Sequence, residues 1–414
     1  MATPHKRQCQ QEPTTLMSLG DDMLAEILRR LTSLSSFARA AFACKRLRHV
    51  ISSPSYSSVV ATRIMSSAPL VGYFISVIGG AAPSFHRALL GSDRDVASIV
   101  RHGKFQFADF DDYSWRLMDC RHGLLLLSSD SCMAVFDPLT DKHFRITHCT
   151  SRISHCKSSS FHCILLASGA DATSFRVLCL ECTSGGRVRP HVYSSRTGEW
   201  QSHQLAPKTI KPPRRVDPHS NHNLPMHAGG GRVYWRTHAA VLTSFDVGSM
   251  EFSHVPLPGG LNHLSSYAVG DAEDGTTCLV AVSAEHQQKL DMRVWLLKMG
   301  EHGSLSSSPW ERQWRVDASD ELDLLAIPAA RSSHARKVYD VTAGVVLLSV
   351  GYKHNGIRYV AVRIKDTLRR EGATKTDTDT DTKRQTLILA DFCSSSGWLH
   401  PYFMAWPRPS LKVP

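Results

Sequence analysis

The spacing of apolar side chains changes once along the chain, from a helical period to a strand period. Between residues 21 and 52, apolar residues recur three and four positions apart, which is the spacing of one face of a helix. An Asp pair at 21–22 can cap the N-terminus of the first helix, and a Ser pair at 35–36 can cap the N-terminus of the second. We expect three short helices, the last ending before Pro54. The first apolar stripe comprises Leu24, Ile27, Leu28 and Leu31.

These helices are too few to form a core of their own. Together they span about 35 residues, and a domain of fewer than about 40 residues rarely folds without extra support. Part of their apolar surface therefore needs a partner. That partner is either another protein or the remainder of this chain, in which case the helices form a cap on its C-terminal domain.

Beyond Pro54 the apolar residues lie in short runs separated by turn-forming residues, and the helical spacing is lost. Runs rich in β-branched and aromatic residues between turn signals predict strands. We therefore expect an all-β region. The clearest runs are Gly123–Leu127, Phe175–Leu180, Arg232–Trp235, Cys278–Val282, Val294–Leu297, Gly344–Leu348, Tyr359–Val362 and Leu387–Leu389.

One uncharged stretch, residues 64–85, approaches the length of a transmembrane helix. It contains several serine, glycine and proline residues, which suit a spanning helix poorly. Its core, Val71–Ile78, is dominated by β-branched and aromatic residues and favours one buried strand. We therefore expect no membrane partner.

Three segments share a pattern that indicates an internal repeat: Phe136–Phe144, Tyr193–Trp200 and Phe245–Phe252. Each begins with an aromatic residue at a strand end, passes through a turn that contains Asp or Ser, and ends on an aromatic residue that opens the return strand. Their starting residues are 57 and 52 positions apart. A period of about 50 residues matches a four-stranded propeller blade with variable loops.

Further aromatic residues extend this repeat. Val294–Leu297, followed by Trp310 and Trp314, resembles a fourth copy with a longer hairpin, and Trp398 with Trp406 can close the ring. The chain beyond the helices is long enough for six or seven such blades.

The sequence thus predicts an α+β multidomain chain, in which a short three-helix domain precedes an all-β domain that is a six- or seven-bladed β-propeller. A β-sandwich, or two unrelated β domains, is the alternative for the β region. The expected boundaries are a disordered tail at 1–14, a helical domain at 15–60 and the β domain at 61–414. Segments of biased composition predict flexible loops at 206–228, 299–309 and 371–384.

Composition is that of an ordinary soluble protein. The 414 residues are 42% apolar and include 11 cysteines, too few for a disulfide scaffold. Residues 1–12 lack the apolar core of a secretory signal. We expect reduced thiols and a location in the nucleus, the cytoplasm or both.

The charge is basic, with 48 Lys and Arg against 37 Asp and Glu and a net charge of +11. Residues 1–60 contribute +4 of this excess and the other 354 residues +7. The one notable concentration, Lys208–Arg215, falls in an expected loop. This distribution favours acidic or phosphorylated partners over nucleic acid.

Adjacent His and Cys residues at 148–149, 155–156 and 162–163 are the strongest candidates for a metal site, because both residue types bind zinc. On a strand, however, a step of seven residues reverses the face, and the Ser-rich segment between them suits a helix poorly. We expect neither a metal nor a cofactor. The sequence also contains no phosphate-binding loop, dinucleotide fingerprint, nucleophile elbow or HExxH motif.

Two segments of the helical region, Leu19–Leu31 and Ser36–Ile51, resemble the F-box motif in order, spacing and N-terminal position. The chain departs from the usual motif at Gly20, Phe37, Ala43 and Leu47. The resemblance implies that these helices bind the Skp-type adaptor of cullin–RING ubiquitin ligases. The residues that it places at the adaptor are Leu19, Leu24, Ile27, Leu28, Leu31, Phe37 and Cys44.

The β region is similar to the kelch-like or F-box-associated propellers of plant F-box proteins, through Val192–Trp200 and Gly231–Trp235. Together the two resemblances imply a non-catalytic substrate receptor of an SCF-type ubiquitin ligase, whose β domain holds an unknown target protein. The alternative is a propeller enzyme or carbohydrate-binding protein with an incidental helical cap. The charge alone raises a third hypothesis, nucleic-acid binding.

Overall fold

The computed structural model comprises two compact units, residues 1–64 and 65–414. The residues that the structure describes are 19–30, 45–52, 70–77, 83–88, 103, 105–107, 110, 115–149, 160–166, 174–183, 185–211, 226–227, 231–238, 241–259, 261, 266–272, 275–282, 291–299, 305–317, 337–352, 356–364, 387–392 and 397–403.

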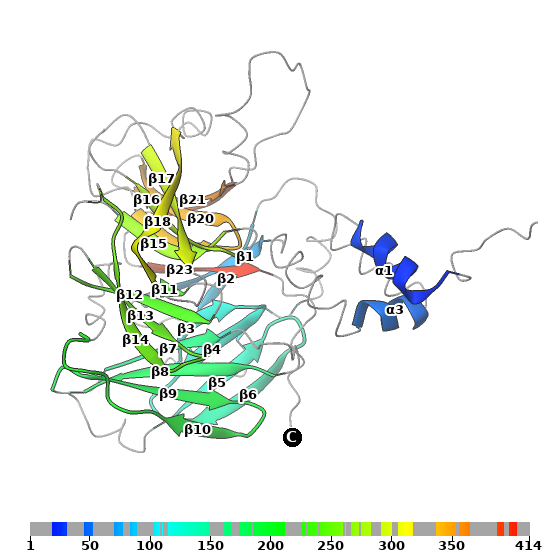
Figure 1. Ribbon diagram of the computed structural model, residues 1–414. Helices are drawn as coiled ribbons and strands as arrows, with labels where there is room; N and C mark the ends of the chain where they lie inside the picture. The colour runs from blue at the N-terminus through cyan, green and yellow to red at the C-terminus, as the bar shows by residue number, and fades with distance from the viewer. Residues whose placement is uncertain are drawn as a thin grey trace, which may run out of the picture. The chain divides into compact units, whose positions relative to one another are not determined.

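The N-terminal unit contains two described helices, α1 (Asp21–Arg29) and α3 (Lys45–Ser52), which pack against each other (Figure 1). These are the first and last of the three expected helices, and the expected middle helix lies outside the described residues. Each helix buries one apolar stripe, as its period predicts. The buried residues are Leu24, Leu28, Leu47 and Val50.

The start of α1 differs from the expectation. The N-cap is Gly20, in extended conformation, and no side chain caps the helix. Asp21 and Asp22 lie within the first turn, where their carboxylates interact favourably with the helix dipole. The prediction that the Asp pair caps α1 is therefore wrong, because the helix already begins at Asp21.

The second unit contains six antiparallel sheets among its described residues, five with four strands and one with three (Figure 1). The first four-stranded sheet comprises β3 (Arg116–Arg121), β4 (Leu124–Ser128), β5 (Cys132–Asp137) and β6 (Lys142–Thr147). The second comprises β7 (Ser160–Leu166), β8 (Arg176–Cys182), β9 (Val188–Ser194) and β10 (Glu199–Ser202). The third comprises β11 (Met226–His227), β12 (Arg232–His238), β13 (Val241–Asp246) and β14 (Glu251–Pro256).

The fourth comprises β15 (Ser266–Asp271), β16 (Thr277–Val282), β17 (Asp291–Met299) and β18 (Leu305–Asp317). The fifth comprises β19 (Lys337–Thr342), β20 (Val345–Tyr352), β21 (Gly356–Arg363) and β22 (Leu387–Phe392). In all five the strands follow chain order. The three-stranded sheet instead joins β1 (Leu70–Val77) and β2 (Ser84–Arg87) to β23 (Gly397–Phe403), so early and late parts of the unit meet in one sheet.

The second strand of a four-stranded sheet is buried on both faces, which explains its continuous apolar sequence. In β8, Val177 and Cys179 belong to a hydrophobic cluster shared with sheet β3–β6. The alternate residues Leu178 and Leu180 belong to a cluster shared with sheet β11–β14. Because strand side chains alternate between faces, one strand packs on both neighbouring sheets.

Similar clusters join each later sheet to the next, and β23 contacts β3 to bring the last sheet to the first. The six sheets thus follow one another in a cycle. This is a propeller-like arrangement, distinct from the two packed layers of a β-sandwich.

The aromatic repeat marks the same position in three sheets. All three segments form the hairpin between the third and fourth strands, β5–β6, β9–β10 and β13–β14. Tyr193 lies opposite Trp200, and Phe245 lies opposite Phe252. In the fourth copy, β17 pairs with β18 through Trp310 and Trp314, as predicted.

Two tryptophans of this repeat connect neighbouring sheets at their outer edges. Trp200 Nε1 donates to the carbonyl oxygen of Thr147, the last residue of β6, at 2.8 Å. Trp310 Nε1 donates to the carbonyl oxygen of Pro256, the last residue of β14, at 2.7 Å. The repeat therefore includes a bond between sheets as well as the hairpin itself.

Parts of two segments that the sequence predicts to be flexible loops contain a strand or packed residues. The segment expected at 299–309 contains the start of β18, because Leu305 pairs with Met299. The segment expected at 206–228 begins with residues packed on β9, since the Ala206 N–H donates to the Val188 carbonyl oxygen and Ile210 is buried. The expected tail at 1–14 and the loop at 371–384 lie outside the described residues.

The uncharged stretch contains strand β1, which confirms the predicted strand at 71–78. In the part of the chain that the structure describes, no helix has the length and hydrophobicity needed to cross a membrane.

Candidate functional site

An arginine adds polar contacts between the two N-terminal helices, beside their buried apolar stripes. Arg46, in α3, places Nε 2.9 Å and Nη2 2.8 Å from Asp21 Oδ1, at the start of α1. Its Nη2 also donates to the Leu19 carbonyl oxygen at 2.6 Å. Arg46 thus binds the residues on both sides of Gly20, and it orders the entry to α1 although no side chain caps the helix.

Only part of the predicted adaptor surface is exposed. Ile27 is 40% exposed, Leu19 is half-buried, and Leu24 and Leu28 are buried. The sequence interpretation missed Met23, which is 57% exposed and lies one turn before Ile27. Their spacing of four residues was the available signal, because it places two side chains on one helix face. The other predicted contacts, Leu31, Phe37 and Cys44, lie outside the described residues.

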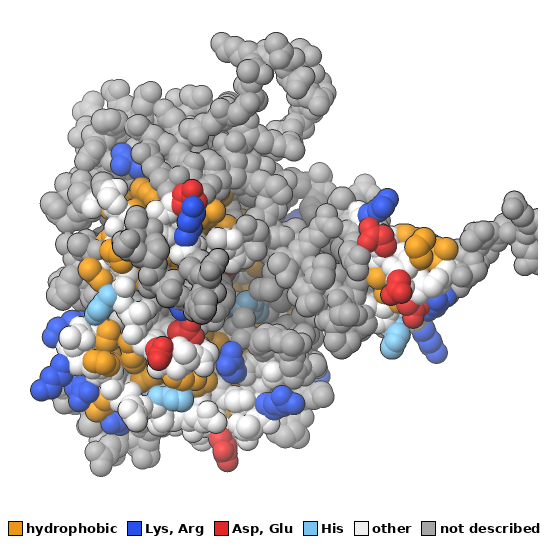
Figure 2. Space-filling model, in the orientation of Figure 1, with side chains coloured by type: hydrophobic (Ala, Val, Ile, Leu, Met, Phe, Trp, Pro, Cys, Tyr) orange, Lys and Arg blue, Asp and Glu red, His pale blue; other side chains and the backbone are white. Residues whose placement is uncertain are grey.

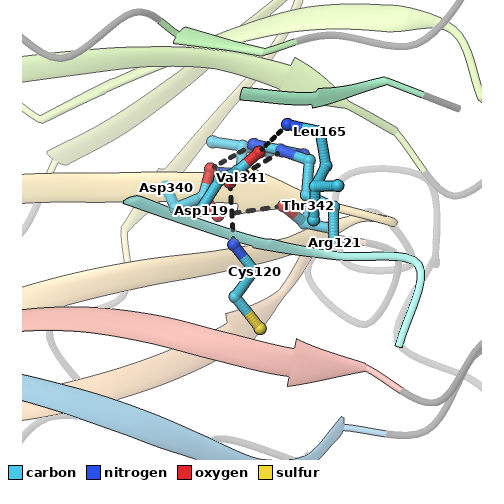
Figure 3. Close-up of polar contacts among 7 residues, drawn as sticks. All are labelled: Asp119, Cys120, Arg121, Leu165, Asp340, Val341 and Thr342. Carbon is cyan, nitrogen blue, oxygen red and sulfur yellow. Dashed lines mark hydrogen bonds and ion pairs between the residues drawn. The ribbon is translucent and has the colours of Figure 1, made fainter. Parts of the chain in front are cut away.

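A second group of functional interest lies in the β unit, where charged side chains of the first strands of different sheets converge (Figure 3). Arg121 of β3 is within 3.5 Å of Asp119 Oδ1 and, through Nη2, within 3.6 Å of Asp340 Oδ1 on β19. The Arg121 side chain is only 9% exposed. We refer to Asp119, Arg121, Asp271 of β15, Asp340 and His400 of β23 as the axial cluster.

Asp119 and Asp340 are equivalent in structure. Each lies at a shift in strand register and accepts a hydrogen bond from the N–H of the next residue at 2.9 Å. Each is followed by a tight turn that ends in glycine at positive φ, Gly123 and Gly344. The carboxylates then differ, since Asp119 accepts from the Leu165 N–H of β7 and Asp340 from the hydroxyl of Thr342 (Figure 3).

The cluster carries more acidic than basic groups, and burial changes their ionisation. Burial raises the pKa of Asp271 to about 7, and Asp340 adds to this effect while Arg121 opposes it. Burial also raises the pKa of Asp119. For Arg121, burial acts to lower the pKa, but the three surrounding aspartates outweigh it and the pKa rises. Arg121 therefore stays charged, and its ion pair with Asp340 links the first strands of two sheets, β3 and β19.

His400 joins the cluster from the closing strand β23. Burial lowers its pKa to about 4, an effect that Arg121 strengthens and Asp340 opposes. The imidazole is therefore neutral near pH 7. Sequence reasoning missed the whole cluster. A signal for its two equivalent aspartates was present, because both begin an Asp-x-x-x-Gly pattern that precedes an apolar run, at 119–123 and at 340–344.

A hydrogen-bonded row crosses the sheet β7–β10. His191 Nδ1 lies 2.8 Å from Ser202 Oγ, and its Nε2 lies 3.2 Å from Glu181 Oε2. Burial lowers the pKa of His191, so the neutral ring accepts from the serine and donates to the carboxylate. In the same row, Cys163 Sγ and Cys179 Sγ are 2.7 Å apart. The row connects all four strands of the sheet.

The described His/Cys pairs, 148–149 and 162–163, form no metal centre, although the thiols of Cys149 and Cys163 both lie beside Cys179. His148 Nε2 lies 3.0 Å from the Ser129 carbonyl oxygen, whereas His162 is buried in β7, where burial lowers its pKa to about 4. The pair at 155–156 lies outside the described residues. Within the described ranges, no group of three or more His, Cys, Asp or Glu residues has a metal-binding arrangement.

Solved structures with related shapes share little sequence with this chain. The SapL1 lectin in complex with alpha methyl fucoside is 11% identical, with a TM-score of 0.33 over 58% of this chain and 73% of that one. The WD40 domain of SCAP from fission yeast is 8% identical, with a TM-score of 0.33 over 68% and 63%. A mutant Aleuria aurantia lectin in complex with alpha-methyl-L-fucoside is 10% identical, with a TM-score of 0.32 over 67% and 77%. Similarity at this level assigns no ligand.

No curated protein matches the chain significantly. A protein-family model does, and it covers residues 116–363, from β3 to β21, which is more than half of the chain. The match includes four of the aromatic hairpins and both equivalent aspartates of the axial cluster. The chain therefore belongs to the family described as F-box protein AT5G49610-like, beta-propeller.

Proposed function

We propose that this protein is the substrate receptor of an SCF-type cullin–RING ubiquitin ligase, in which the N-terminal helices bind the Skp-type adaptor and the β unit binds a target protein. The observation that carries the proposal is membership of an F-box protein family in a chain whose propeller region follows an F-box-like helical pair. The receptor acts in the nucleus, the cytoplasm or both, without cofactor, membrane or nucleic acid.

The adaptor surface is centred on the exposed face of α1. Met23 and Ile27 are the two exposed large apolar side chains among the described residues, at 57% and 40%. Exposed apolar groups on one helix face fit a helix-packing partner. Leu24 and Leu28 stabilise the pairing of α1 with α3 and so support this face indirectly. Leu19, Leu31, Phe37 and Cys44 complete the proposed adaptor contacts.

In this proposal the six sheets are the six blades of a closed propeller, and the chain performs no chemistry of its own. The receptor raises the effective concentration of the target at the recruited ubiquitin-transfer enzyme. The mechanism therefore depends on two binding surfaces carried by one chain, the helical pair and the β unit.

The experiment is co-precipitation of a purified Skp-type adaptor by the full chain and by the double variant Met23→Asp with Ile27→Asp. We expect adaptor binding to fall by at least about tenfold, because two carboxylates would be buried against an apolar partner. Both positions are exposed, so the helices should still form, as circular dichroism can check. Leu28→Asp is less informative, because it would unfold the buried pairing.

Lys45→Asp is the matched control, since it places the same carboxylate at an exposed position of the helical pair, where the start of α3 tolerates it. This control should keep adaptor binding. Equal binding by the wild type and the double variant, or no binding by the wild type, would contradict the proposed function.

A further inference from the structure

Basic side chains gather at one margin of the β unit, where sheet β7–β10 lies in Figure 1, at the lower left of Figure 2. Four of the basic residues in this sheet and in the segment after it lie close in sequence and structure. Arg187 and Arg189 come from the β8–β9 connection and from β9, and Lys208 and Lys211 from the segment that follows β10. We call these four residues the basic patch.

Backbone hydrogen bonds place the two halves of the patch side by side. The Ala206 N–H donates to the Val188 carbonyl oxygen at 2.8 Å, and the His203 N–H donates to the Pro190 carbonyl oxygen at 3.0 Å. The segment after β10 therefore runs along the start of β9. A turn closed by the Ile210 N–H and the Pro207 carbonyl oxygen then exposes Lys208.

Lys211 is held at the far end of this segment. Its carbonyl oxygen accepts a hydrogen bond from Trp235 Nε1 at 3.0 Å, and Trp235 is fully buried. The Lys211 side chain is exposed. The segment that carries both lysines is thus anchored to β9 at one end and to β12 at the other, so its charges project from a supported backbone.

The positive charge of the patch is largely uncompensated. Arg189 lies 3.9 Å from Glu181, a carboxylate that also contacts His191. Arg187, Lys208 and Lys211 form no ion pair among the described residues. An uncompensated group of cations attracts an anionic partner, and it does so over about a Debye length of 8 Å at physiological salt.

Arg187 is already oriented for such a partner. Its Nε and Nη2 donate to the Ala206 carbonyl oxygen at 3.2 and 2.8 Å. Two of its five N–H donors are used in this way, and the other three make no contact among the described residues. A guanidinium held in place loses little side-chain entropy on binding, and its planar donors match the oxygens of a phosphate group.

The surroundings of the patch favour a peptide over a nucleic acid or a membrane. Two aromatic rings on the strands next to the patch, Tyr193 of β9 and Trp235 of β12, are buried and so offer no face for a base to stack on. No exposed large apolar side chain of the described residues lies in the β unit, so a lipid bilayer would find no apolar anchor there.

We propose that the basic patch binds a phosphorylated segment of the target protein. In this arrangement Arg187 and Arg189 contact the phosphate oxygens, and Lys208 and Lys211 attract the remaining negative charge of the segment. Four cations on adjoining segments fit a dianion with three strong acceptor oxygens and the chain that carries it. This inference rests on the proposed function, because it specifies the kind of target that the receptor holds.

The test is binding of the full chain to a degenerate peptide library with a central phosphoserine, compared with the same library carrying serine or glutamate at that position. We expect enrichment of phosphoserine peptides, and a selected peptide should bind at least about tenfold more weakly to Lys208→Glu with Lys211→Glu. Higher salt should weaken binding. The matched control Arg196→Glu, an exposed charge reversal in the β9–β10 turn, should leave the Kd unchanged.

Several results would overturn the inference. The first is no enrichment of phosphoserine peptides, or binding of the glutamate library as strong as that of the phosphoserine library. The second is binding of the selected peptide by the lysine variant as strong as by the wild type. The third is tighter binding of a ten-nucleotide single strand or of phosphatidylserine vesicles than of the peptide. Adaptor co-precipitation on the same preparation separates the two proposals. A chain that binds the adaptor and no phosphopeptide refutes only the patch, whereas one that binds phosphopeptides and no adaptor refutes the receptor function.

Discussion

Tyr402 Oη donates a hydrogen bond to the Gly123 carbonyl oxygen at 3.2 Å, across 279 residues of sequence. Tyr402 is fully buried in the closing strand β23, and Gly123 lies in the turn between β3 and β4. The ring of Tyr402 also contacts Phe74, Phe85 and Phe105. One side chain thus joins the three-stranded sheet to the first four-stranded sheet.

Removing only this hydroxyl should weaken the junction between the two sheets. We expect Tyr402→Phe to lower the free energy of unfolding by about 1 kcal/mol, since the aromatic packing remains and a buried carbonyl loses its partner. Urea unfolding monitored by tryptophan fluorescence measures the change. An unchanged midpoint at unchanged m-value would show that the bond contributes nothing to closure.

The two tryptophan bonds between outer edges should act independently. Trp200→Phe and Trp310→Phe each remove an indole N–H that bonds a carbonyl of the neighbouring sheet. We expect a larger loss for Trp310, which is buried, than for the more exposed Trp200. Because the two bonds lie between different pairs of sheets, the double variant should lose the sum of the single changes within about 0.5 kcal/mol. Coupling well beyond this range would contradict the independence of these interfaces.

Gly270 allows β15 to approach β19 closely. A Cβ atom at this position would overlap the Val341 carbonyl group, which is backbone and cannot move aside. We expect Gly270→Ala to destabilise the β unit by about 3 kcal/mol, the upper end of the usual cost of overpacking. Thermal unfolding measures the loss. Gly259→Ala is the control, because a Cβ there meets nothing within 4 Å, and a loss as large in this control would contradict the steric explanation.

The axial cluster should make stability depend on pH through two opposing effects. The raised pKa of Asp271, about 7 in the folded protein, favours folding below pH 4, and this contribution is lost as the pH rises toward 7. The lowered pKa of His400, about 4, acts in the opposite sense, because its contribution is present above pH 6.5 and is lost as the pH falls toward 4. His122 and His162, with pKa values also lowered to about 4, add to the second effect.

Asp271→Asn removes only the first effect. The variant should therefore lose stability more steeply than the wild type on acidification from pH 6.5 to 4, by up to about 1.4 kcal/mol for each pH unit. Urea unfolding at pH 4.5, 5.5 and 6.5 provides the comparison. Parallel curves for the two proteins would mean that Asp271 does not hold a proton in the folded state.

The strands that sequence analysis identified are mostly those buried on both faces. The run Cys278–Val282, for example, is apolar without interruption because its two faces pack on different sheets. The first strand of a sheet is harder to identify from its sequence. Arg116–Arg121 and Lys337–Thr342 mix charged and apolar residues without a regular period, because Asp119, Arg121 and Asp340 contribute to the axial cluster and the register shifts beside each aspartate.

The axial cluster was beyond sequence reasoning because its members come from sheets far apart in the chain. Arg121 and Asp340 are separated by 219 positions, and only the folded arrangement of the sheets brings them together. The predicted adaptor residues show a different limit. The helical period correctly places Leu24 and Leu28 on one apolar face. It does not reveal that this face is buried in the pairing of α1 with α3, or that the neighbouring Met23 and Ile27 are exposed.

The pairing of β23 with β1 also affects the order in which the protein can be completed during synthesis. Strand β1 is made early, yet one of its edges stays without a partner until residues 397–403 leave the ribosome. An unpaired strand edge is a template for misassociation with other chains. The helices α1 and α3 are complete by residue 52, so a nascent chain would display its helical pair long before its β unit can close. A partner that binds those helices can therefore engage the chain while the edge of β1 is still unpaired.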